Sequence, residues 1–248
     1  LDADMRQALA SGDQFFLAYQ PQFSLSNGAC VGVEALLRWQ HPLRGAISPA
    51  QFIPQAERSG FIVTLGAWVL DEACRQARLW REQGVALRIS VNVSPLQIRR
   101  GGFAEQVQTT LSAHGLEPDA IELELTESLL VDDGSAAART LNALADHGVQ
   151  LAIDDFGTGY SNLGYLRRFQ IGRLKIDRSF VAPLDDAQHD EAIVQAIVQM
   201  ANSLGIDTLA EGVETEAQRQ RLSSLGCKHA QGFLWHRALP AEDCASVW

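Results

Sequence analysis

Short apolar runs alternate with amphipathic segments along most of the chain, and a glycine usually separates the two. The segment from about Leu65 to Gln83 has one apolar face at helical spacing and ends at Gly84, and an apolar run of strand length follows. This succession of helix, glycine and strand recurs, with strand-like runs at residues 85–94, 120–126, 151–155, 173–177, 206–211 and 228–234. A glycine directly after a helix is the expected C-terminal cap. The alternation is typical of an α/β fold.

The first part of the chain follows a different pattern. Two strand-like runs, at residues 15–25 and 30–39, are joined by Ser26-Asn27-Gly28-Ala29, and Asn-Gly is a strong hairpin signal. Too few residues separate the runs for a helical crossover, so we expect them to pair antiparallel. With the six later runs this makes eight strands. The sequence predicts a closed, TIM-like (β/α)8 barrel; the alternative is an open, doubly wound sheet.

The domain organisation follows from the same pattern. Residues 1–12 are mildly helical, and we expect them to be a lead-in from a preceding domain, with residues 13–248 forming one domain. Two segments match the capping-box signature at the start of a helix, namely Ser48-Pro49-Ala50-Gln51 and Thr215-Glu216-Ala217-Gln218. Pro240 is expected to open a last short helix.

Composition narrows the functional classes. The chain has 248 residues, 46% of them apolar, which is enough for a sizeable core. Its net charge of −10, with no basic patch, argues against nucleic acid as a partner. No apolar run approaches the roughly 20 residues that cross a bilayer, so we expect no membrane contact by this domain. The four cysteines are isolated, as expected of free thiols in a reducing compartment.

Two adjacent carboxylates end the central strand, in the sequence Asp154-Asp155-Phe156-Gly157-Thr158-Gly159. Neighbouring residues on a strand point to opposite faces, so the two can converge only where the backbone turns. Close carboxylates repel each other unless protons or cations compensate their charge. A pair of divalent cations would do so, and a solvated turn after a strand is the alternative.

Polar residues recur at the same end of the other expected strands. Strands closed into a barrel beneath helices have no solvated face, so this repetition favours a carboxylate-rich cation site at the C-terminal ends. Oxygen and amide ligands without cysteine or histidine suit Mg²⁺ or Mn²⁺ better than zinc. Lys175 and Arg38 are the candidate phosphate contacts. The polar residues include Glu34, Asn92, Glu122, Glu124, Asp154, Asp155, Lys175, Asp177, Glu211, Glu214 and Gln231.

A series of motifs now makes a family resemblance specific. In order along the chain they are Tyr19-Gln20-Pro21, Glu34-Ala35-Leu36-Leu37-Arg38, Val91-Asn92-Val93-Ser94, Glu124-Leu125-Thr126-Glu127, Asp154-Asp155-Phe156-Gly157, Lys175-Ile176-Asp177, Glu211-Gly212-Val213-Glu214 and Gln231-Gly232-Phe233. From about Leu17 to Pro240 the chain resembles the EAL-domain family of bacterial cyclic di-GMP phosphodiesterases. Its departures are Phe233 where tyrosine is common, and Asn162 and Gly164 where serines are frequent.

The resemblance implies a barrel whose first strand is antiparallel to the others, and it assigns roles to residues. Catalytic roles fall to Glu211, Lys175 and Glu34. Two metals are held at the positions of Glu34, Asn92, Glu124, Asp154, Asp155 and Glu211, with Asp154 bridging. Substrate contacts or supporting positions are implied for Gln20, Arg38, Asp177, Glu214 and Gln231. Glu127 resembles the residue that steadies the loop after Asp155.

The implied activity is metal-dependent hydrolysis of cyclic di-GMP to linear pGpG. The cofactors would be two Mg²⁺ or Mn²⁺ ions, and Ca²⁺ is expected to inhibit because it accepts looser geometry. One alternative is a catalytically silent cyclic di-GMP receptor that acts through protein partners. Another keeps the barrel and makes it a different Mg²⁺-dependent lyase or hydrolase.

The resemblance also implies partners and a location. We expect a homodimer formed near the loop Phe156–Ser161, and sensor or cyclase-like domains N-terminal to this one. We expect the domain in the bacterial cytoplasm, either free or as the cytoplasmic part of a larger membrane-anchored protein.

Overall fold

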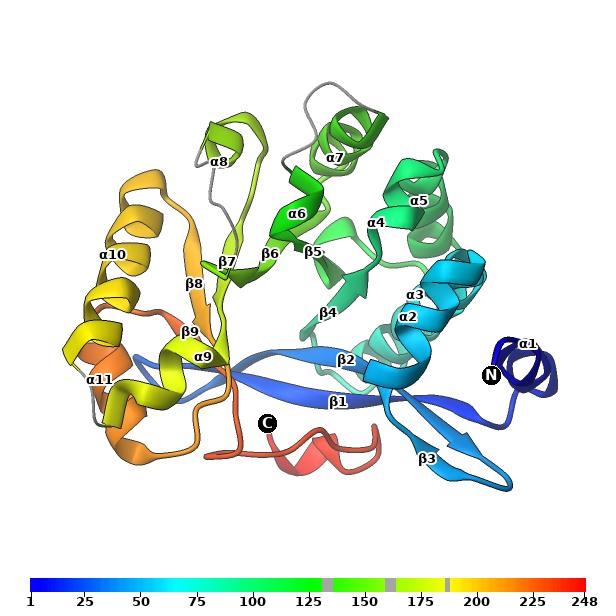
Figure 1. Cartoon of the computed structure of the whole chain (residues 1–248), viewed down its shortest axis with the longest axis horizontal. Helices are drawn as coiled ribbons and strands as arrows, with labels where there is room; N and C mark the ends of the chain where they lie inside the picture. Colours follow the sequence, from blue (N-terminus) through cyan, green and yellow to red (C-terminus); the bar gives the residue numbers. More distant parts are fainter. Residues whose placement is uncertain (131–135, 159–163, 186–187) are drawn as a thin grey trace.

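Eight strands close into a barrel in the computed structural model, which describes residues 1–130, 136–158, 164–185 and 188–248 (Figure 1). In barrel order the strands are β1 (Phe15–Ser24), β9 (His229–Ala230), β8 (Asp207–Ala210), β7 (Arg173–Ile176), β6 (Gln150–Phe156), β5 (Ile121–Thr126), β4 (Arg88–Val93) and β2 (Cys30–His41). Pairing of β1 with β2 closes the ring. The closed barrel expected from the sequence is confirmed, and the open sheet is wrong.

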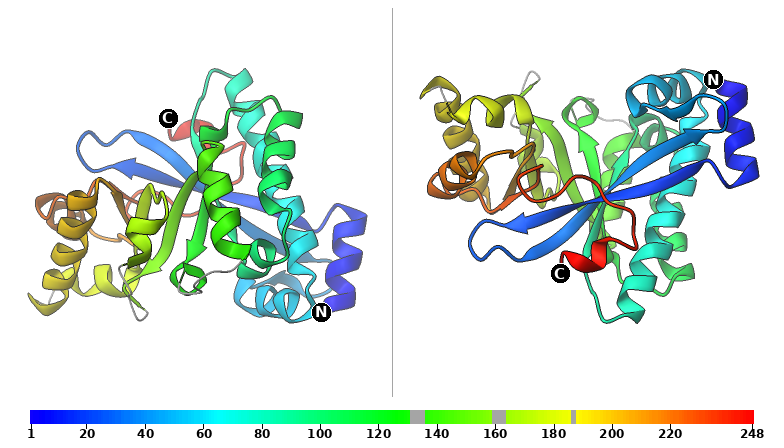
Figure 2. Two further views of the ribbon diagram at one scale, coloured as in Figure 1. Left: turned by 90° about the horizontal axis from the view of Figure 1, so that it is seen from above. Right: turned by 90° about the horizontal axis from the view of Figure 1, so that it is seen from below.

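The first strand runs against its two neighbours. β1 pairs antiparallel with β2 over Phe15 to Phe23 and antiparallel with β9, whereas all pairs from β2 through β4 to β9 are parallel. The C-terminal segment then crosses β1, where Tyr19 and Leu239 exchange backbone hydrogen bonds (Figure 2). The hairpin predicted from Asn27-Gly28 is therefore confirmed.

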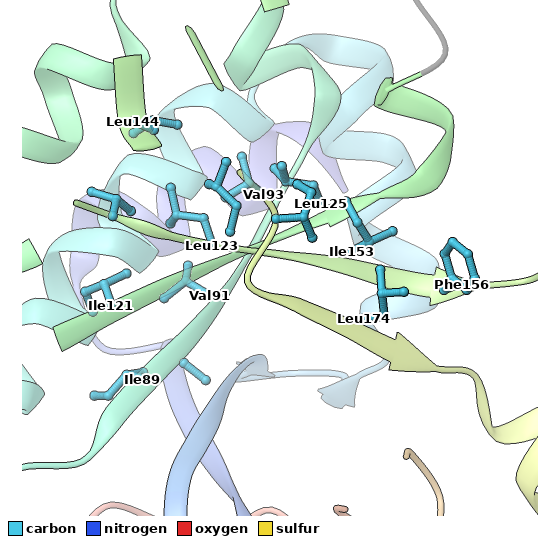
Figure 3. Packing of buried hydrophobic residues seen from close by; sticks show 14 of the residues in the cluster. Ile89, Val91, Val93, Ile121, Leu123, Leu125, Leu144, Ile153, Phe156 and Leu174 are labelled. Atoms are coloured by element: carbon cyan, nitrogen blue, oxygen red, sulfur yellow. The ribbon is translucent and has the colours of Figure 1, made fainter. Parts of the chain in front are cut away.

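Alternation along the parallel strands divides the side chains between two environments. Val91, Leu123 and Ile153 point outward from β4, β5 and β6 and are buried among the surrounding helices (Figure 3). Polar residues at the intervening positions, such as Asn92 and Glu124, then face the barrel interior, because successive side chains alternate. The apolar layer is what holds these polar side chains against one another inside the ring.

Helices cover the outside of the parallel strands (Figure 1). The longer ones are α3 (Ile62–Glu82), α5 (Phe103–Ala113), α7 (Ala136–Asp146), α10 (Gln188–Leu204) and α11 (Glu216–Ser224). Short helices follow several strands, namely α4 (Pro95–Arg99), α6 (Glu127–Leu130), α8 (Gly164–Arg168) and α9 (Arg178–Val181). Single 3₁₀ turns lie at Pro118–Ala120, Ala182–Asp185 and Cys244–Ser246. None of the helices in the described residues is both long and apolar enough to cross a bilayer.

A second apolar cluster lies beside the barrel. It joins α1 (Asp2–Ser11) and α2 (Pro49–Ser59) to the far end of the β1–β2 hairpin, and β3 (Gly45–Ile47) extends this end. Met5 and Ala8 of α1 are fully buried in it, beside Phe52 and Trp39. The lead-in expected at residues 1–12 thus packs onto this edge of the domain.

Details of three helix ends test the sequence signatures. The capping box at Thr215 and Gln218 forms as predicted. The one expected at Ser48 is wrong: the Ser48 side chain makes no cap hydrogen bond, and the backbone N–H of Gln51 donates to the Ser48 carbonyl oxygen instead. The helix expected to open at Pro240 is also wrong, because a turn leads into the single 3₁₀ turn at Cys244–Ser246.

Candidate functional site

Asp154 and Asp155 converge through an unusual backbone conformation at the end of β6. Asp155 has a φ of +53°, a left-handed value that a non-glycine residue adopts at a cost. The pairing of β6 with β7 shifts register between Ile153 and Phe156, so Asp155 lies in a bulge. One carboxylate oxygen from each of Asp154, Asp155 and Glu211 lies within 4.8 Å of the others. The convergence expected from the sequence is present, and Asp155 itself makes the turn.

Lys175 lies at the centre of the acidic cluster. Its fully buried Nζ atom is 2.6 Å from Glu124, 2.8 Å from Glu211, 3.0 Å from Asp154 and 3.5 Å from Glu34. These four carboxylates come from β2, β5, β6 and the residue after β8, so one amine connects four sides of the barrel. A buried ammonium is stable only when paired in this way.

Two side-chain amides hold the Glu34 carboxylate in place. Asn92 donates from Nδ2 to Glu34 Oε1 at 2.8 Å, and Gln231 donates from Nε2 to Glu34 Oε2 at 2.6 Å. The same Gln231 nitrogen is 3.1 Å from Glu211 Oε1. Both oxygens of the Glu34 carboxylate are therefore fixed in direction.

The electrostatics of the cluster follow from burial and from crowding of like charge. Burial, helped by the negative charges of Glu34 and Asp154, outweighs Lys175 and raises the pKa of Glu211 to about 7. Burial and Glu34 likewise raise the pKa of Glu124 well above its ordinary value. The carboxylates thus hold more negative charge than one lysine neutralises.

Two further pKa values have opposite causes. Burial would raise the pKa of Glu34, but Lys175 and the hydrogen bonds from Gln231 and Asn92 outweigh it and leave that pKa below its ordinary value. Burial would lower the pKa of Lys175, but the surrounding carboxylates hold that pKa well above its ordinary value. Lys175 is therefore a permanent cation, and Glu34 a permanent anion, at neutral pH.

The acidic cluster fits a cation on structural grounds. Glu124 Oε1 is buried and accepts no hydrogen bond from the residues that the structure describes, which is costly for a carboxylate oxygen. Carboxylate and amide oxygens are the donors that Mg²⁺ and Mn²⁺ prefer. Residues that could hold such ions are the six expected from the sequence, namely Glu34, Asn92, Glu124, Asp154, Asp155 and Glu211.

The cluster lies beside two cavities. One, of about 880 Å³, is lined by Glu34, Asp155 and Glu211. It is also lined by four of the residues expected to contact substrate or support the site, namely Gln20, Asp177, Glu214 and Gln231. The other, of about 300 Å³, is lined by Asn92, Arg38 and a largely apolar wall. Asn92 of the smaller cavity is hydrogen-bonded to Glu34 of the larger one, so the acidic cluster lies beside both cavities.

Arg38 lies apart from the other expected contacts. It lines the smaller cavity, is partly buried, and donates from Nη1 to the carbonyl oxygen of Leu37 at 3.0 Å. Burial lowers its pKa from the ordinary value, and Glu34 opposes this. Arg38 is therefore positioned for a ligand that extends past Asn92.

Glu127 directly follows β5 and is the first residue of α6. It is buried, and its Oε2 accepts from the backbone N–H of Gly157 at 3.4 Å, next to the aspartate pair. This contact joins β5 to the turn after Asp155, as the resemblance implies for this position. Residues 159–161 of the loop expected to form a dimer lie outside the described residues.

Three buried polar residues were not assigned roles from the sequence, and Glu122, which was expected at the cation site, lies with them instead. They form a layer below the acidic cluster and comprise Gln22, Ser90, Glu122 and Arg173. The signal that could have identified them is the period of two along a strand, since Gln22 is two residues from Gln20 and Arg173 two residues from Lys175. Phe233 was noted only as a departure; it is 50% exposed, lines the larger cavity and stacks under the Arg237 guanidinium at 3.9 Å.

Comparison with curated proteins gives relatives of much greater length. MucR of Pseudomonas aeruginosa, a bifunctional diguanylate cyclase and cyclic di-GMP phosphodiesterase, is 50% identical over 241 residues, which are 97% of this chain and 35% of MucR. A cyclic di-GMP phosphodiesterase from the same organism is 39% identical over 93% of this chain and 39% of its own length. The chain thus spans between a third and two fifths of these proteins.

Solved structures with the same fold cover nearly the whole chain. The phosphodiesterase of P. aeruginosa MucR, in complex with c-di-GMP, superposes with a TM-score of 0.92 at 50% identity and covers 97% of this chain and 98% of that one. The EAL enzyme Bd1971, bound to cAMP and cyclic di-GMP, gives a TM-score of 0.93 at 32% identity and covers 99% and 67%. Residues 2–238 match the family described as EAL domain. This chain belongs to the EAL domain family.

Proposed function

We propose that this chain hydrolyses one phosphodiester bond of cyclic di-GMP and releases linear pGpG. The observation that carries the proposal is the acidic cluster around Lys175, which is complete and lies beside two cavities. MucR, half of whose aligned residues are identical to this chain, is named a cyclic di-GMP phosphodiesterase. Family membership and an intact site point to the same activity.

Two Mg²⁺ or Mn²⁺ ions would be held by the six residues of the site, with Asp154 between them. When bound, such ions supply Lewis acidity and lower the pKa of water towards neutrality. Asp154, Asp155 and Glu211 each bring a carboxylate oxygen within 4.8 Å of the others, and Asn92 is hydrogen-bonded to Glu34. The convergence of all six side chains, including Glu211, within the barrel supports their assignment as ligands.

The chain's own residues account for the rest of the reaction. Lys175 supplies a fixed positive charge beside the position of the scissile phosphate, where it offsets the charge that develops on the phosphoryl oxygens. Glu211 has two roles open to it, as a metal ligand and as acceptor of the proton from the attacking water. The water attacks phosphorus in line and the 3′ oxygen leaves, so one P–O bond forms as another breaks.

The shape of the site suits a molecule with two bases. Cyclic di-GMP carries a guanine on each side of its ring of two phosphodiesters, and residues of the acidic cluster line two separate cavities. Arg38 would contact a phosphate from the smaller cavity, and Gln20, Asp177, Glu214 and Gln231 would contact substrate or support the site in the larger one.

Two other functions use the same cavity and are separable. A silent receptor would bind cyclic di-GMP without cleaving it, and a generic Mg²⁺ hydrolase would cleave other phosphodiesters as well. Relatives lacking metal ligands are the natural receptors, so the intact set of ligands here favours the enzyme. The chain is expected to work as a homodimer in the bacterial cytoplasm, alone or attached to sensor or cyclase-like domains. Light scattering on the purified chain tests the dimer.

Incubation with cyclic di-GMP and Mg²⁺ tests the proposal, with the product identified by chromatography. We expect pGpG in the presence of Mg²⁺ and none in excess chelator. Binding without turnover would establish the receptor instead. Equal turnover of a simple chromogenic phosphodiester would establish the generic hydrolase.

A further inference from the structure

A second buried polar layer lies beneath the acidic cluster, towards the N-terminal ends of the parallel strands. Its side chains are between 1% and 5% exposed, and each lies two residues along a strand from a residue of the site. The layer consists of Gln22, Ser90, Glu122 and Arg173. Buried polar groups are costly unless hydrogen-bonded, so the connections of this layer have consequences for the layer above.

A single chain of hydrogen bonds joins the two layers. Arg173 Nη1 donates to Gln22 Oε1 at 3.1 Å, and Gln22 Nε2 donates to Gln231 Oε1 at 3.0 Å. Gln231 Nε2 then donates to Glu34 Oε2 at 2.6 Å and to Glu211 Oε1 at 3.1 Å. Every bond in this chain points in the same direction, from the arginine towards the acidic cluster.

Arg173 fixes this direction because a guanidinium can only donate hydrogen bonds. Gln22 must therefore turn its carbonyl oxygen to Arg173, which leaves its amide nitrogen facing Gln231. Gln231 in turn must accept with its oxygen and present its nitrogen to the carboxylates. Arg173 is itself held by Glu122, whose Oε1 lies 2.9 Å from Nη1 and also accepts from Ser90 at 2.9 Å.

The backbone opposite Gln22 is shaped to admit its amide. Gly32 pairs with Gln22 across β1 and β2, and a Cβ atom at Gly32 would lie 3.2 Å from Gln22 Oε1 and 3.0 Å from the Arg88 carbonyl oxygen. Both distances are tighter than ordinary van der Waals contact. A side chain at this position would press on the Gln22 oxygen that Arg173 holds.

We propose that Arg173 and Gln22 are positioning residues that lock the Gln231 amide with its N–H groups towards Glu34 and Glu211. The inference rests on the proposed metal-dependent function, because it concerns how two of the metal ligands are oriented. A reversed Gln231 amide would turn its oxygen to those carboxylates and repel them. The carboxylates would then be held less firmly for a cation, so metal affinity depends on residues that never touch the metal.

Gln22→Glu tests the direction of the hydrogen bonds. It keeps the size of the side chain and an acceptor for Arg173, but a carboxylate cannot donate to Gln231 Oε1. We expect the Mn²⁺ affinity of the metal-free protein, measured by electron paramagnetic resonance, to fall about tenfold, at the low end of the range for groups that orient metal ligands. A simple charge effect would tighten binding instead. Turnover should recover as Mn²⁺ is raised, which a folding defect would not allow.

Gln76→Leu on α3 is a control at a buried glutamine outside both layers. Gln22→Leu removes the hydrogen bonds from Gln22 to Arg173 and Gln231 without adding charge. Gln76→Leu should bind Mn²⁺ as the wild type does, and Gln22→Leu more weakly. Wild-type protein that binds no Mn²⁺ would refute the proposed function itself. If the wild type binds Mn²⁺ and Gln22→Glu binds it equally well or more tightly, only the positioning role of Gln22 and Arg173 would be refuted. If Gln22→Glu does not fold by circular dichroism, equal affinities of Gln22→Leu and Gln76→Leu overturn the inference, and a weaker Gln22→Leu supports it.

Discussion

Asp154 and Glu127 differ in how directly they serve the proposed metals. Asp154 is proposed to bridge the two ions, so Asp154→Asn should remove nearly all turnover while the fold is kept. Glu127 acts through its contact with the backbone N–H of Gly157, so Glu127→Ala should leave measurable activity, with a loss of about 10- to 100-fold. Steady-state hydrolysis at saturating Mg²⁺, with circular dichroism as the fold control, measures both. Higher activity in Asp154→Asn than in Glu127→Ala would refute the bridging role.

Glu211 makes the stability of the metal-free protein depend on pH. Its pKa of about 7 in the folded protein lies above its ordinary value of 4.5, so folding favours the protonated form. The contribution of protonated Glu211 to the free energy of unfolding is fully present below pH 4.5, and it is lost as the pH rises through 7. The loss is on the order of 3 kcal/mol at pH 8.

Glu211→Gln removes this dependence because glutamine does not titrate. In excess chelator, its melting temperature should exceed that of the wild type at pH 8 and approach it at pH 5. Thermal unfolding at the two pH values provides the measurement. A variant that is no more stable than the wild type at pH 8 would show that Glu211 carries no such strain.

At the scale of elements, the β9 end depends on a glycine that nothing larger can replace. A Cβ atom at Gly232 would lie 2.1 Å from the Val213 carbonyl oxygen and 2.3 Å from its nitrogen, and neither backbone atom can move away cheaply. Gly232→Ala should therefore destabilise the protein by about 3 kcal/mol or more. It should also lower turnover, because Gln231 is the adjacent residue.

Gly12→Ala is the matched comparison for that variant. Gly12 also caps an element, with a φ of +74°, but has open space where a Cβ would be. Its cost should be only that of the left-handed conformation, about 1 kcal/mol. Urea unfolding of both variants decides, and a Gly232→Ala variant no less stable than Gly12→Ala would contradict the packing argument.

Elements with a local signal could be predicted from the sequence. The hairpin followed from Asn27-Gly28, and the later strands followed from glycine-terminated helices. β3, α4, α6 and α9 could not, because three to five residues are too few for a periodic pattern. The Ser94 capping box of α4 has the same signature as the one at Thr215 but overlaps the end of a strand pattern. At Ser48 the signature was present and the hydrogen bonds were not.

Some features of the site could likewise be predicted from the sequence, and others could not. Its acidic residues could be predicted because they recur at strand ends and match family motifs. The central place of Lys175 and the contact of Gln22 with Gln231 depend on closure of the barrel, and the latter joins residues 209 positions apart. Such contacts have no local signal. The placement of Arg38 on a separate cavity likewise follows only from the path of β2.

At the scale of the whole molecule, the metal requirement follows from a surplus of buried carboxylates around one lysine. Activity should require Mg²⁺ or Mn²⁺ and be inhibited by Ca²⁺, because Ca²⁺ is larger, takes more ligands and would misplace the attacking water. Turnover in chelated protein reconstituted with each ion measures this. Full activity with Ca²⁺ alone, or in excess chelator, would contradict it.

Hydrolysis of cyclic di-GMP in water enriched with oxygen-18 tests the central claim most directly. Attack of water on phosphorus, with the 3′ oxygen leaving, places one labelled oxygen on the 5′-phosphate of pGpG, which mass spectrometry detects. The wild type with Mg²⁺ should give this singly labelled product, and Asp154→Asn under the same conditions should leave the substrate intact. Unlabelled product, or cyclic di-GMP that stays intact in the presence of wild-type protein and Mg²⁺, would contradict the account.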